Sequence, residues 1–163
     1  MSDQDYWIES ICCGPGHTHR VFEDSRAIQQ AVFVEEQGVD PANVFNDEHG
    51  ATHFVLYIKV NDSAVPVACA RVLGGRLRNP IKIGRVATLA EHRHHKYARR
   101  LLEYIIQQQG ERYQPPYFFL NSQVDARGLY ESLSFQACGE IFNEAGIRHV
   151  RMELPWQPTT SAA

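Results

Sequence analysis

The chain has 163 residues, a mass of 18.6 kDa and a formal net charge of −3, which suits a single globular domain. This mild acidity argues against a nucleic-acid partner, because such binding relies on clustered Lys and Arg. No apolar run approaches the ~18–20 residues that span a bilayer, so no membrane partner is expected. The acidic, polar N-terminus lacks the basic and apolar regions of an export signal, which predicts a cytoplasmic protein.

The first half of the chain predicts a strand, a helix and a β-hairpin. The breaker Gly14-Pro15-Gly16 ends the strand. Asp24 or Ser25 could cap a helix that continues to about Glu36. The turn residues Asn61-Asp62-Ser63 join two β-rich runs into a hairpin. The expected ranges are a strand at 6–13, a polar loop at 40–50, and hairpin strands at 52–60 and 65–73.

A basic loop between a strand and a helix comes next. Apolar residues alternate at period two before the loop and follow helical spacing after it. The loop itself, Arg93-His94-His95-Lys96, would place positive side chains and backbone N–H groups at a helix start, which suits a phosphate. The residues that carry these patterns are Ile81, Ile83, Ala87 and Leu89 in the strand and Ala98, Leu101, Leu102 and Ile105 in the helix.

The last part of the chain predicts a buried strand, a short helix and two closing strands. Pro115-Pro116 ends the long helix, and the apolar run that follows is typical of a strand buried on both faces. The whole layout is an α+β domain with one strand–helix–strand crossover. The expected ranges are a strand at 117–121, a helix at 126–133, strands at 136–142 and 147–154, a single domain over 1–154 and a flexible tail over 155–163.

Four stretches together resemble the GNAT N-acetyltransferase superfamily, in its ElaA/YjcF-like branch, across residues 20–154. Arg93-His94-His95-Lys96-Tyr97-Ala98 resembles the pyrophosphate motif Arg/Gln-x-x-Gly-x-Gly/Ala. Val32-Phe33-Val34-Glu35-Glu36-Gln37-Gly38-Val39 resembles the first-helix signature, and Leu129-Tyr130-Glu131-Ser132-Leu133-Ser134-Phe135 the Phe-Tyr-x-x-Leu-Gly-Phe segment. Phe142-Asn143-Glu144-Ala145-Gly146-Ile147-Arg148-His149-Val150-Arg151-Met152 resembles the strand pair that closes the fold.

The resemblance implies a mixed, mostly antiparallel sheet whose two central parallel strands splay apart and are flanked by helices. The gap would admit the pantetheine arm of acetyl-CoA, whose amides could pair with the exposed backbone. The resemblance also implies acyltransferase activity, by direct attack of a primary amine of a small molecule or peptide. The implied cofactor-binding residues are Val86, Ala87, Thr88, Arg93, His94, His95, Lys96, Tyr97, Ala98 and Asn121.

The resemblance places Tyr130 where a hydroxyl can protonate the departing thiolate. The plain alternative is a half-buried core tyrosine, because Tyr130 also belongs to the apolar face of its helix. Residues that could shape the acceptor site are Glu36, Gln37, His53 and Gln123. Each has a structural alternative, such as a solvated helix charge or a satisfied strand histidine.

Lys96 and Ser134 replace two glycines of the family pattern. Glycine permits a positive φ and close approach of backbone to phosphate, so weaker cofactor binding is one consequence to test. A non-catalytic acyl-CoA-binding module on the same fold is therefore the alternative to an enzyme, and the closing strands could offer an edge for a homodimer.

No metal site is expected. His92, His94 and His95 lie close together in sequence but lack the i, i+4 spacing and third ligand of a helical zinc site. The cysteines form no disulfide or metal-binding pattern, so reduced, mostly buried thiols are expected rather than a catalytic one. They are Cys12, Cys13, Cys69 and Cys138.

Overall fold

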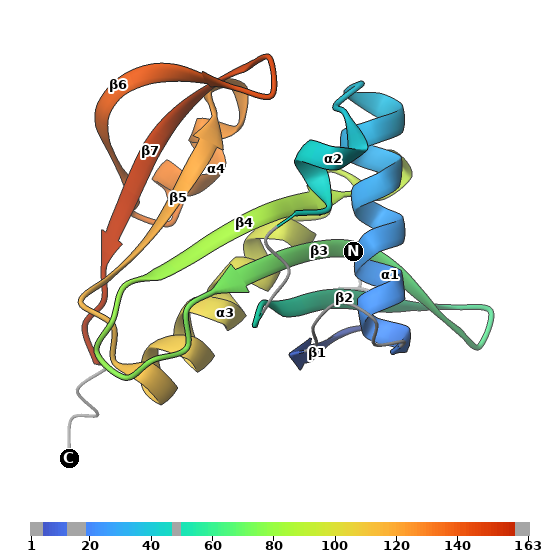
Figure 1. Cartoon of the computed structure of the whole chain (residues 1–163). Helices are drawn as coiled ribbons and strands as arrows, with labels where there is room; N and C mark the ends of the chain where they lie inside the picture. Colours follow the sequence, from blue (N-terminus) through green and yellow to red (C-terminus); the bar gives the residue numbers. More distant parts are fainter. Residues whose placement is uncertain (1–4, 13–18, 47–49, 159–163) are drawn as a thin grey trace.

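The computed structural model describes residues 5–12, 19–46 and 50–158. In these ranges, seven strands form a single sheet in the order β1-β2-β3-β4-β5-β7-β6, with helices on both faces (Figure 1). Every neighbouring pair is antiparallel except β4 with β5. The predicted mixed, mostly antiparallel α+β sheet is confirmed. In the described part of the chain, no helix is long and apolar enough to cross a membrane.

The elements follow the predicted order. The strands are β1 (Tyr6–Cys12), β2 (Thr52–Val60), β3 (Ser63–Leu73), β4 (Ile81–Thr88), β5 (Tyr117–Gln123), β6 (Gln136–Glu144) and β7 (Ile147–Pro155). The helices are α1 (Arg20–Gln29), the π-helix η1 (Gln30–Glu36), α2 (Pro41–Val44), the 3-10 helix η2 (Ala90–His92), α3 (Tyr97–Tyr113), the 3-10 helix η3 (Val124–Ala126) and α4 (Arg127–Ser132). The predicted breaker at 14–16 and Cys13 lie outside the described residues.

The first helix begins earlier than the sequence predicted. His19 is its N-cap, and the His19 ring accepts a hydrogen bond from the backbone N–H of Val21 at 3.2 Å. Asp24 instead accepts the Tyr57 hydroxyl at 2.6 Å. Ser25 is completely buried and bonds across to β2. The capping prediction was therefore wrong, because both side chains are engaged with the sheet rather than with the helix backbone.

The hairpin between β2 and β3 is confirmed. Asn61 and Asp62 have φ of 48° and 65°, and two consecutive left-handed residues form the turn whose twist matches that of the strands. Strand β3 begins at Ser63, two residues before the predicted start. Pro66 pairs opposite Tyr57, next to a register shift, where its missing N–H is tolerated.

A β-bulge divides β4 into two parts that face opposite sides of the sheet. The pairing with β3 moves from Arg71–Gly84 to Cys69–Ala87, so β4 carries one extra residue, and Arg85 has φ of 51°. Ile83 packs in the cluster on the α3 side, whereas Ala87 packs in the cluster on the α1 side. The predicted single buried face over residues 81–89 was wrong, since one extra residue inverts the alternation.

Strands β4 and β5 separate soon after they meet, which confirms the expected splay. Their ladder consists of Ile81–Phe118 and Lys82–Phe119. Past this point β4 continues beside β3, while β5 runs beside β7, and Figure 1 shows the two halves of the sheet diverging. The fold therefore opens a gap at its centre.

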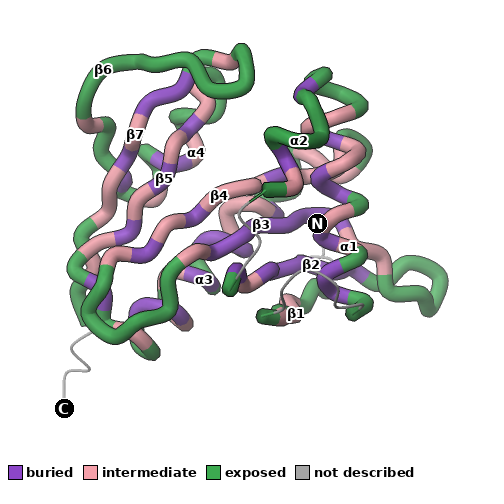
Figure 2. The backbone as a smooth tube through the Cα atoms, in the orientation of Figure 1, coloured by how far each residue is buried: buried purple, intermediate pink, exposed green. Residues whose placement is uncertain are grey.

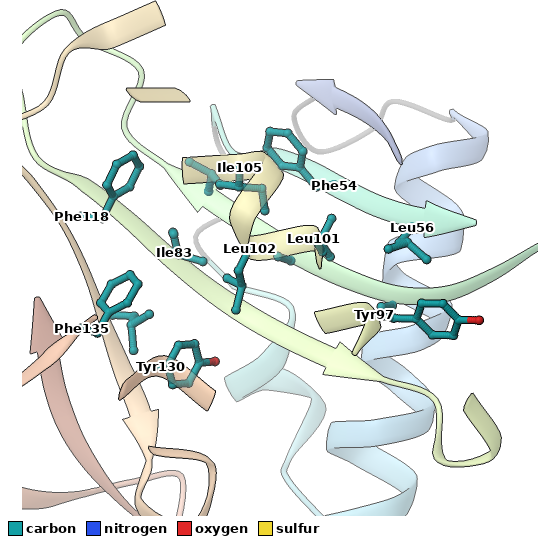
Figure 3. Close-up of a cluster of buried hydrophobic side chains, with 14 of the residues drawn as sticks. Phe54, Leu56, Ile83, Tyr97, Leu101, Leu102, Ile105, Phe118, Tyr130 and Phe135 are labelled. Carbon is teal, nitrogen blue, oxygen red and sulfur yellow. The ribbon is translucent and has the colours of Figure 1, made fainter. Parts of the chain in front are cut away.

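Two hydrophobic clusters lie on opposite faces of the sheet, and the larger one includes residues from both halves. On one face, Leu101, Leu102 and Ile105 of α3 are fully buried against β2 residues such as Phe54 and Leu56 (Figure 3). The predicted buried face of this helix is confirmed. On the other face, α1 packs against β2 and β3 in a smaller cluster. Burial of one such aliphatic side chain contributes about 1.5–3 kcal/mol. Figure 2 shows the buried strands at the centre and the exposed edge strand β6.

The ordered domain extends past the predicted boundary at Leu154. Strand β7 continues to Pro155, and the N–H of Trp156 donates to the carbonyl of Pro116 at 3.3 Å. The Trp156 ring packs on the main cluster directly over Gly110 of α3. The last residues of the predicted tail, 159–163, lie outside the described residues.

The contact between Gly110 and Trp156 generates a stability prediction. A Cβ at position 110 would overlap the indole ring, so Gly110→Ala should displace Trp156. We expect a net loss of about 1–2 kcal/mol, because an overpacking cost of about 1–3 kcal/mol exceeds the gain of about 1 kcal/mol in helix propensity. Urea denaturation measures the difference.

Gly128 in α4 provides the matched control, because a Cβ there meets nothing within 4 Å. Gly128→Ala should leave stability unchanged or raise it slightly. Equal stability of Gly110→Ala and the parent would show that Trp156 contributes nothing to the packing.

Candidate functional site

A cavity of about 610 Å³ occupies the gap between β4 and β5. Its walls include Val86 and Tyr130, which belong to the cluster on the α3 face. They also include Val32 of η1 and Ala87, which belong to the cluster on the α1 face. Residues from both faces of the sheet therefore line the cavity.

The end of β4 forms one wall. Val86, Ala87 and Thr88, which the family resemblance implies as cofactor-binding residues, all line the cavity. This segment pairs with β3 along one edge, and because the ladder with β5 ends at Lys82, its other edge faces the gap. An extended ligand that carries amides can bond to such backbone groups as an added strand does.

The basic loop enters α3 through two left-handed residues. His94 has φ of 71° and Lys96, the N-cap of α3, has φ of 62°. Lys96 thus adopts the conformation that the family glycine would take without strain, at a cost of about 1–2 kcal/mol for a residue with a Cβ. The first N–H groups of the 17-residue helix follow it directly. The arrangement suits an anion.

Arg93 is held between the loop and the first helix. Its Nε donates to the carbonyl of Thr88 at 3.0 Å, and its two terminal nitrogens donate to the Glu36 carboxylate at 2.7 Å each. The hydrogen bonds from Arg93 hold the pKa of Glu36 below its usual value. The planar, two-bond geometry is the one that guanidinium also uses for phosphate. Glu36 therefore occupies the Arg93 face that an anionic ligand would need.

A second bridge joins the halves beside this ion pair. The Gln123 amide donates to Gln37 at 2.9 Å, and Gln37 donates back at 3.5 Å. Gln37 follows η1 and Gln123 ends β5, so the pair spans the cavity mouth. Both line the cavity, together with Asn121 of β5.

Tyr130 lies in the cavity wall on α4. The residue is 7% exposed, and burial raises the pKa of its hydroxyl, which keeps the proton in place. Its ring meets Phe135 edge to face, with centroids 6.0 Å apart (Figure 3). The turn after α4 holds this geometry, since the Phe135 N–H donates to the Tyr130 carbonyl at 3.0 Å. Ser134, with φ of 75°, supplies the left-handed position at which the family has glycine.

His53 does not reach the cavity. It is completely buried beneath α1, bonded through Nδ1 to Ser25 at 2.9 Å, and desolvation lowers the pKa of its ring to about 4. Period-two alternation on β2 directs it to the α1 side, two strands from the gap, which favours the structural alternative of a satisfied strand histidine. Glu36 also does not line the cavity and contacts Arg93 instead.

The predicted loop residues divide into two groups. Arg93 and Ala98 line the cavity. Tyr97 is buried in the main cluster, so only its backbone remains available to a ligand. His94, His95 and Lys96 are exposed at the helix start, outside the cavity walls.

Five charged or ionisable residues that the sequence analysis missed also line the cavity: Arg71, Lys82, Arg85, Glu144 and His149. Arg85, the bulge residue, donates to the carbonyls of Val44 at 2.9 Å and Asn43 at 3.0 Å, which fastens α2 beside the cavity. Glu144 and His149 lie within a stretch that the family resemblance marked only as closing strands. Their alternation on β6 and β7 was the available signal.

The remaining reactive side chains offer no competing chemistry within the described residues. No three His, Cys, Asp or Glu side chains of that part gather as metal ligands. Cys69 is buried, and burial raises the pKa of its thiol to about 12, which leaves no thiolate for attack. Cys12 and Cys138 are also free thiols.

Comparison with known proteins places this site in a family. The sequence matches the family described as the Acetyltransferase (GNAT) domain over residues 28–155. A Bacillus subtilis (strain 168) protein named as a candidate acetyltransferase is 34% identical over 140 residues, which cover 82% of this chain and 86% of that protein. A Schizosaccharomyces pombe protein without a functional name is 30% identical over 132 residues, covering 80% and 85%.

Solved structures share the fold. A candidate N-acetyltransferase from Lactobacillus plantarum has a TM-score of 0.76 at 22% identity and covers 92% of this chain and 97% of its own. Escherichia coli ElaA has a TM-score of 0.75 at 22% identity, covering 91% and 99%. A GNAT acetyltransferase from Elizabethkingia anophelis, solved with acetyl-CoA bound, has a TM-score of 0.60 at 12% identity, covering 91% and 98%. The chain therefore belongs to the GNAT acetyltransferase family, whose activity is acyl transfer.

Proposed function

We propose that this protein transfers an acetyl group from acetyl-CoA to a primary amine of a small molecule or peptide by direct attack. The observation that carries the proposal is the cavity between the splayed strands, which brings Tyr130, the end of β4 and Arg93 of the basic loop around one space. Acetyl-CoA in the Elizabethkingia anophelis structure supports the choice of donor.

The donor would bind through two kinds of contact. The pyrophosphate would meet the loop amides and the first N–H groups of α3, with Arg93 released from Glu36 to bond a phosphate. The pantetheine amides would pair with the backbone at Val86, Ala87 and Thr88. A backbone N–H in this segment would also stabilise the oxyanion of the tetrahedral intermediate.

Tyr130 would act as the general acid. When the amine nitrogen bonds to the thioester carbon and the C–S bond breaks, the departing thiolate takes a proton from the Tyr130 hydroxyl. The pKa of that hydroxyl is raised by burial, so the proton is present at neutral pH. General acids of this kind contribute about 10²- to 10⁴-fold to rate.

The assay that tests the proposal measures CoA release from acetyl-CoA in the presence of glycinamide, spermidine and a short peptide with a free N-terminus. Isothermal titration with CoA is run in parallel. Binding with acetylation of at least one amine supports the enzyme. Binding without acetylation of any of them supports the non-catalytic acyl-CoA module, and absence of binding at millimolar CoA contradicts both.

Replacing Tyr130 with Phe tests the acid. The ring and its contact with Phe135 remain, so CoA affinity should be unchanged while kcat falls about 10²- to 10⁴-fold. Tyr104→Phe is the control, since it removes a hydroxyl from the outer part of α3 at a residue 39% exposed. An unchanged kcat in Tyr130→Phe, with chemistry rate-limiting, would leave Tyr130 a packing residue.

Replacing Glu36 with Gln tests the competition for Arg93. The variant loses the carboxylate that holds the guanidinium, so CoA should bind about two- to five-fold more tightly. Glu35→Gln removes the same charge from the preceding, exposed position and should leave the CoA Kd unaltered. Titration calorimetry at low salt compares the two, and weaker CoA binding in Glu36→Gln would show that Arg93 does not serve the phosphates.

Two substitutions at Lys96 separate its charge from its backbone conformation. If the ammonium contacts a phosphate, Lys96→Ala and Lys96→Gly should both weaken CoA binding about five-fold or less, and added salt should shrink the difference. Lys96→Gly should also raise Tm by about 2–4 °C, because glycine relieves the positive φ. If both variants bind CoA as tightly as the parent, the Lys96 ammonium contributes nothing and the loop binds the pyrophosphate through its backbone amides.

A further inference from the structure

His149 is held in one orientation on β7. Its Nδ1 lies 2.7 Å from the carbonyl oxygen of Ile147. A carbonyl oxygen can only accept, so Nδ1 must carry the hydrogen and donate it. The ring is also stacked on Phe142, with centroids 5.9 Å apart and planes 25° apart. In the neutral ring, Nε2 therefore carries the free lone pair.

The carboxylate of Glu144 lies near Nε2 of His149. The Glu144 Oε2 atom lies 3.7 Å from His149 Nε2. Glu144 ends β6 and His149 lies near the start of β7, so the hairpin register brings the two together. The carbonyl of Ile147 orients the ring through Nδ1, and the carboxylate lies beside Nε2, the nitrogen that can accept a proton. A proton taken up by Nε2 would therefore have an anionic neighbour.

His149 and Glu144 border the cavity from the side opposite Tyr130, the proposed general acid. Val150 and Met152 pack in the cluster on the α3 face, so alternation along β7 directs His149 to the other face. Both His149 and Glu144 line the cavity, as does Tyr130, which belongs to the α3-face cluster. A proton acceptor and a proton donor thus stand on two sides of one space.

We propose that His149 is the general base that deprotonates the acceptor amine, with Glu144 as its charge partner. This inference rests on the proposed acetyl transfer. His149 Nε2 takes one proton from the acceptor ammonium, and the nitrogen lone pair so released forms the C–N bond. The C–S bond breaks with its electron pair on sulfur, which takes the Tyr130 proton. The new amide nitrogen gives up its second proton and restores the Tyr130 hydroxyl, and His149 returns its proton to solvent.

The need for a base follows from the acceptor's chemistry. A lysine-like amine with a pKa of about 10.4 is neutral in roughly one molecule in 2,500 at pH 7. Besides Glu144, Tyr130 and His149, the ionisable groups around the cavity are cationic: Arg71, Lys82, Arg85 and Arg93. Arg151, on the same strand face as His149, lies over the Phe119 ring and near Glu153. A cationic wall disfavours a bound ammonium, so the amine reacts once its proton has passed to His149.

The test uses His149→Asn, because the Asn amide can still donate to Ile147 while the basic nitrogen is lost. With spermidine or glycinamide, whichever the parent acetylates faster, we expect kcat at pH 7 to fall about 10²-fold or more and CoA affinity to stay unchanged. The deficit should shrink as pH rises toward the pKa of the amine, where solvent has already removed the proton.

Glu144→Gln supplies the second arm. It should slow the parent enzyme but have no further effect in the His149→Asn background, since the carboxylate acts through the ring. Long-range ¹H–¹⁵N spectra of the parent should show the Nδ1–H tautomer at His149.

The outcomes separate the two proposals. If the parent acetylates no amine, the proposed function fails. If the parent is active and His149→Asn keeps its rate and pH profile, only this inference fails. A rate deficit in His149→Asn that stays constant with pH, or an Nε2–H tautomer, would likewise overturn the assignment of His149 as base.

Discussion

The parallel pairing of β4 and β5 at only two positions is the constraint on which the rest of this structure depends. A buried backbone group without a partner costs about 1–3 kcal/mol, so a sheet tolerates such a break only where something else meets those groups. Here the break opens a cavity lined by the end of β4, and the family to which the chain belongs transfers acyl groups. The early end of the β4–β5 ladder thus weakens the sheet and also provides the candidate active-site cavity.

Two devices stabilise the open arrangement. The bulge at Arg85 turns the end of β4 toward the other cluster and directs the Arg85 guanidinium to the carbonyls of α2. Gln37 with Gln123 connects segments that belong to different halves of the sheet, and Arg93 with Glu36 joins the basic loop to the end of η1. These connections are polar and partly exposed. They are therefore exchangeable for ligand contacts in a way that the aliphatic packing of α3 is not.

The departures from the family pattern meet the same backbone requirement with different side chains. Lys96 and Ser134 both adopt positive φ at the positions where glycine is usual. Lys96 precedes the first turn of α3, and Ser134 follows the last turn of α4. Burial of the following residue offsets the cost of this strained backbone. Tyr97 is buried after Lys96, and Phe135 is buried after Ser134.

By itself, the sequence determined the local features: the buried face of α3, the turn at Asn61 and Asp62, and the basic loop. These depend on neighbours a few residues apart, so periodicity and turn chemistry reveal them. Only the tertiary structure decided that helix α1 begins after His19, that β4 inverts its faces, that His53 is buried and that His149 faces the cavity. Each of these follows from partners distant in sequence, as in the pairing of Arg93 with Glu36, 57 residues apart. Local patterns cannot encode such partners, because they are brought together only when the strands pair in a particular register.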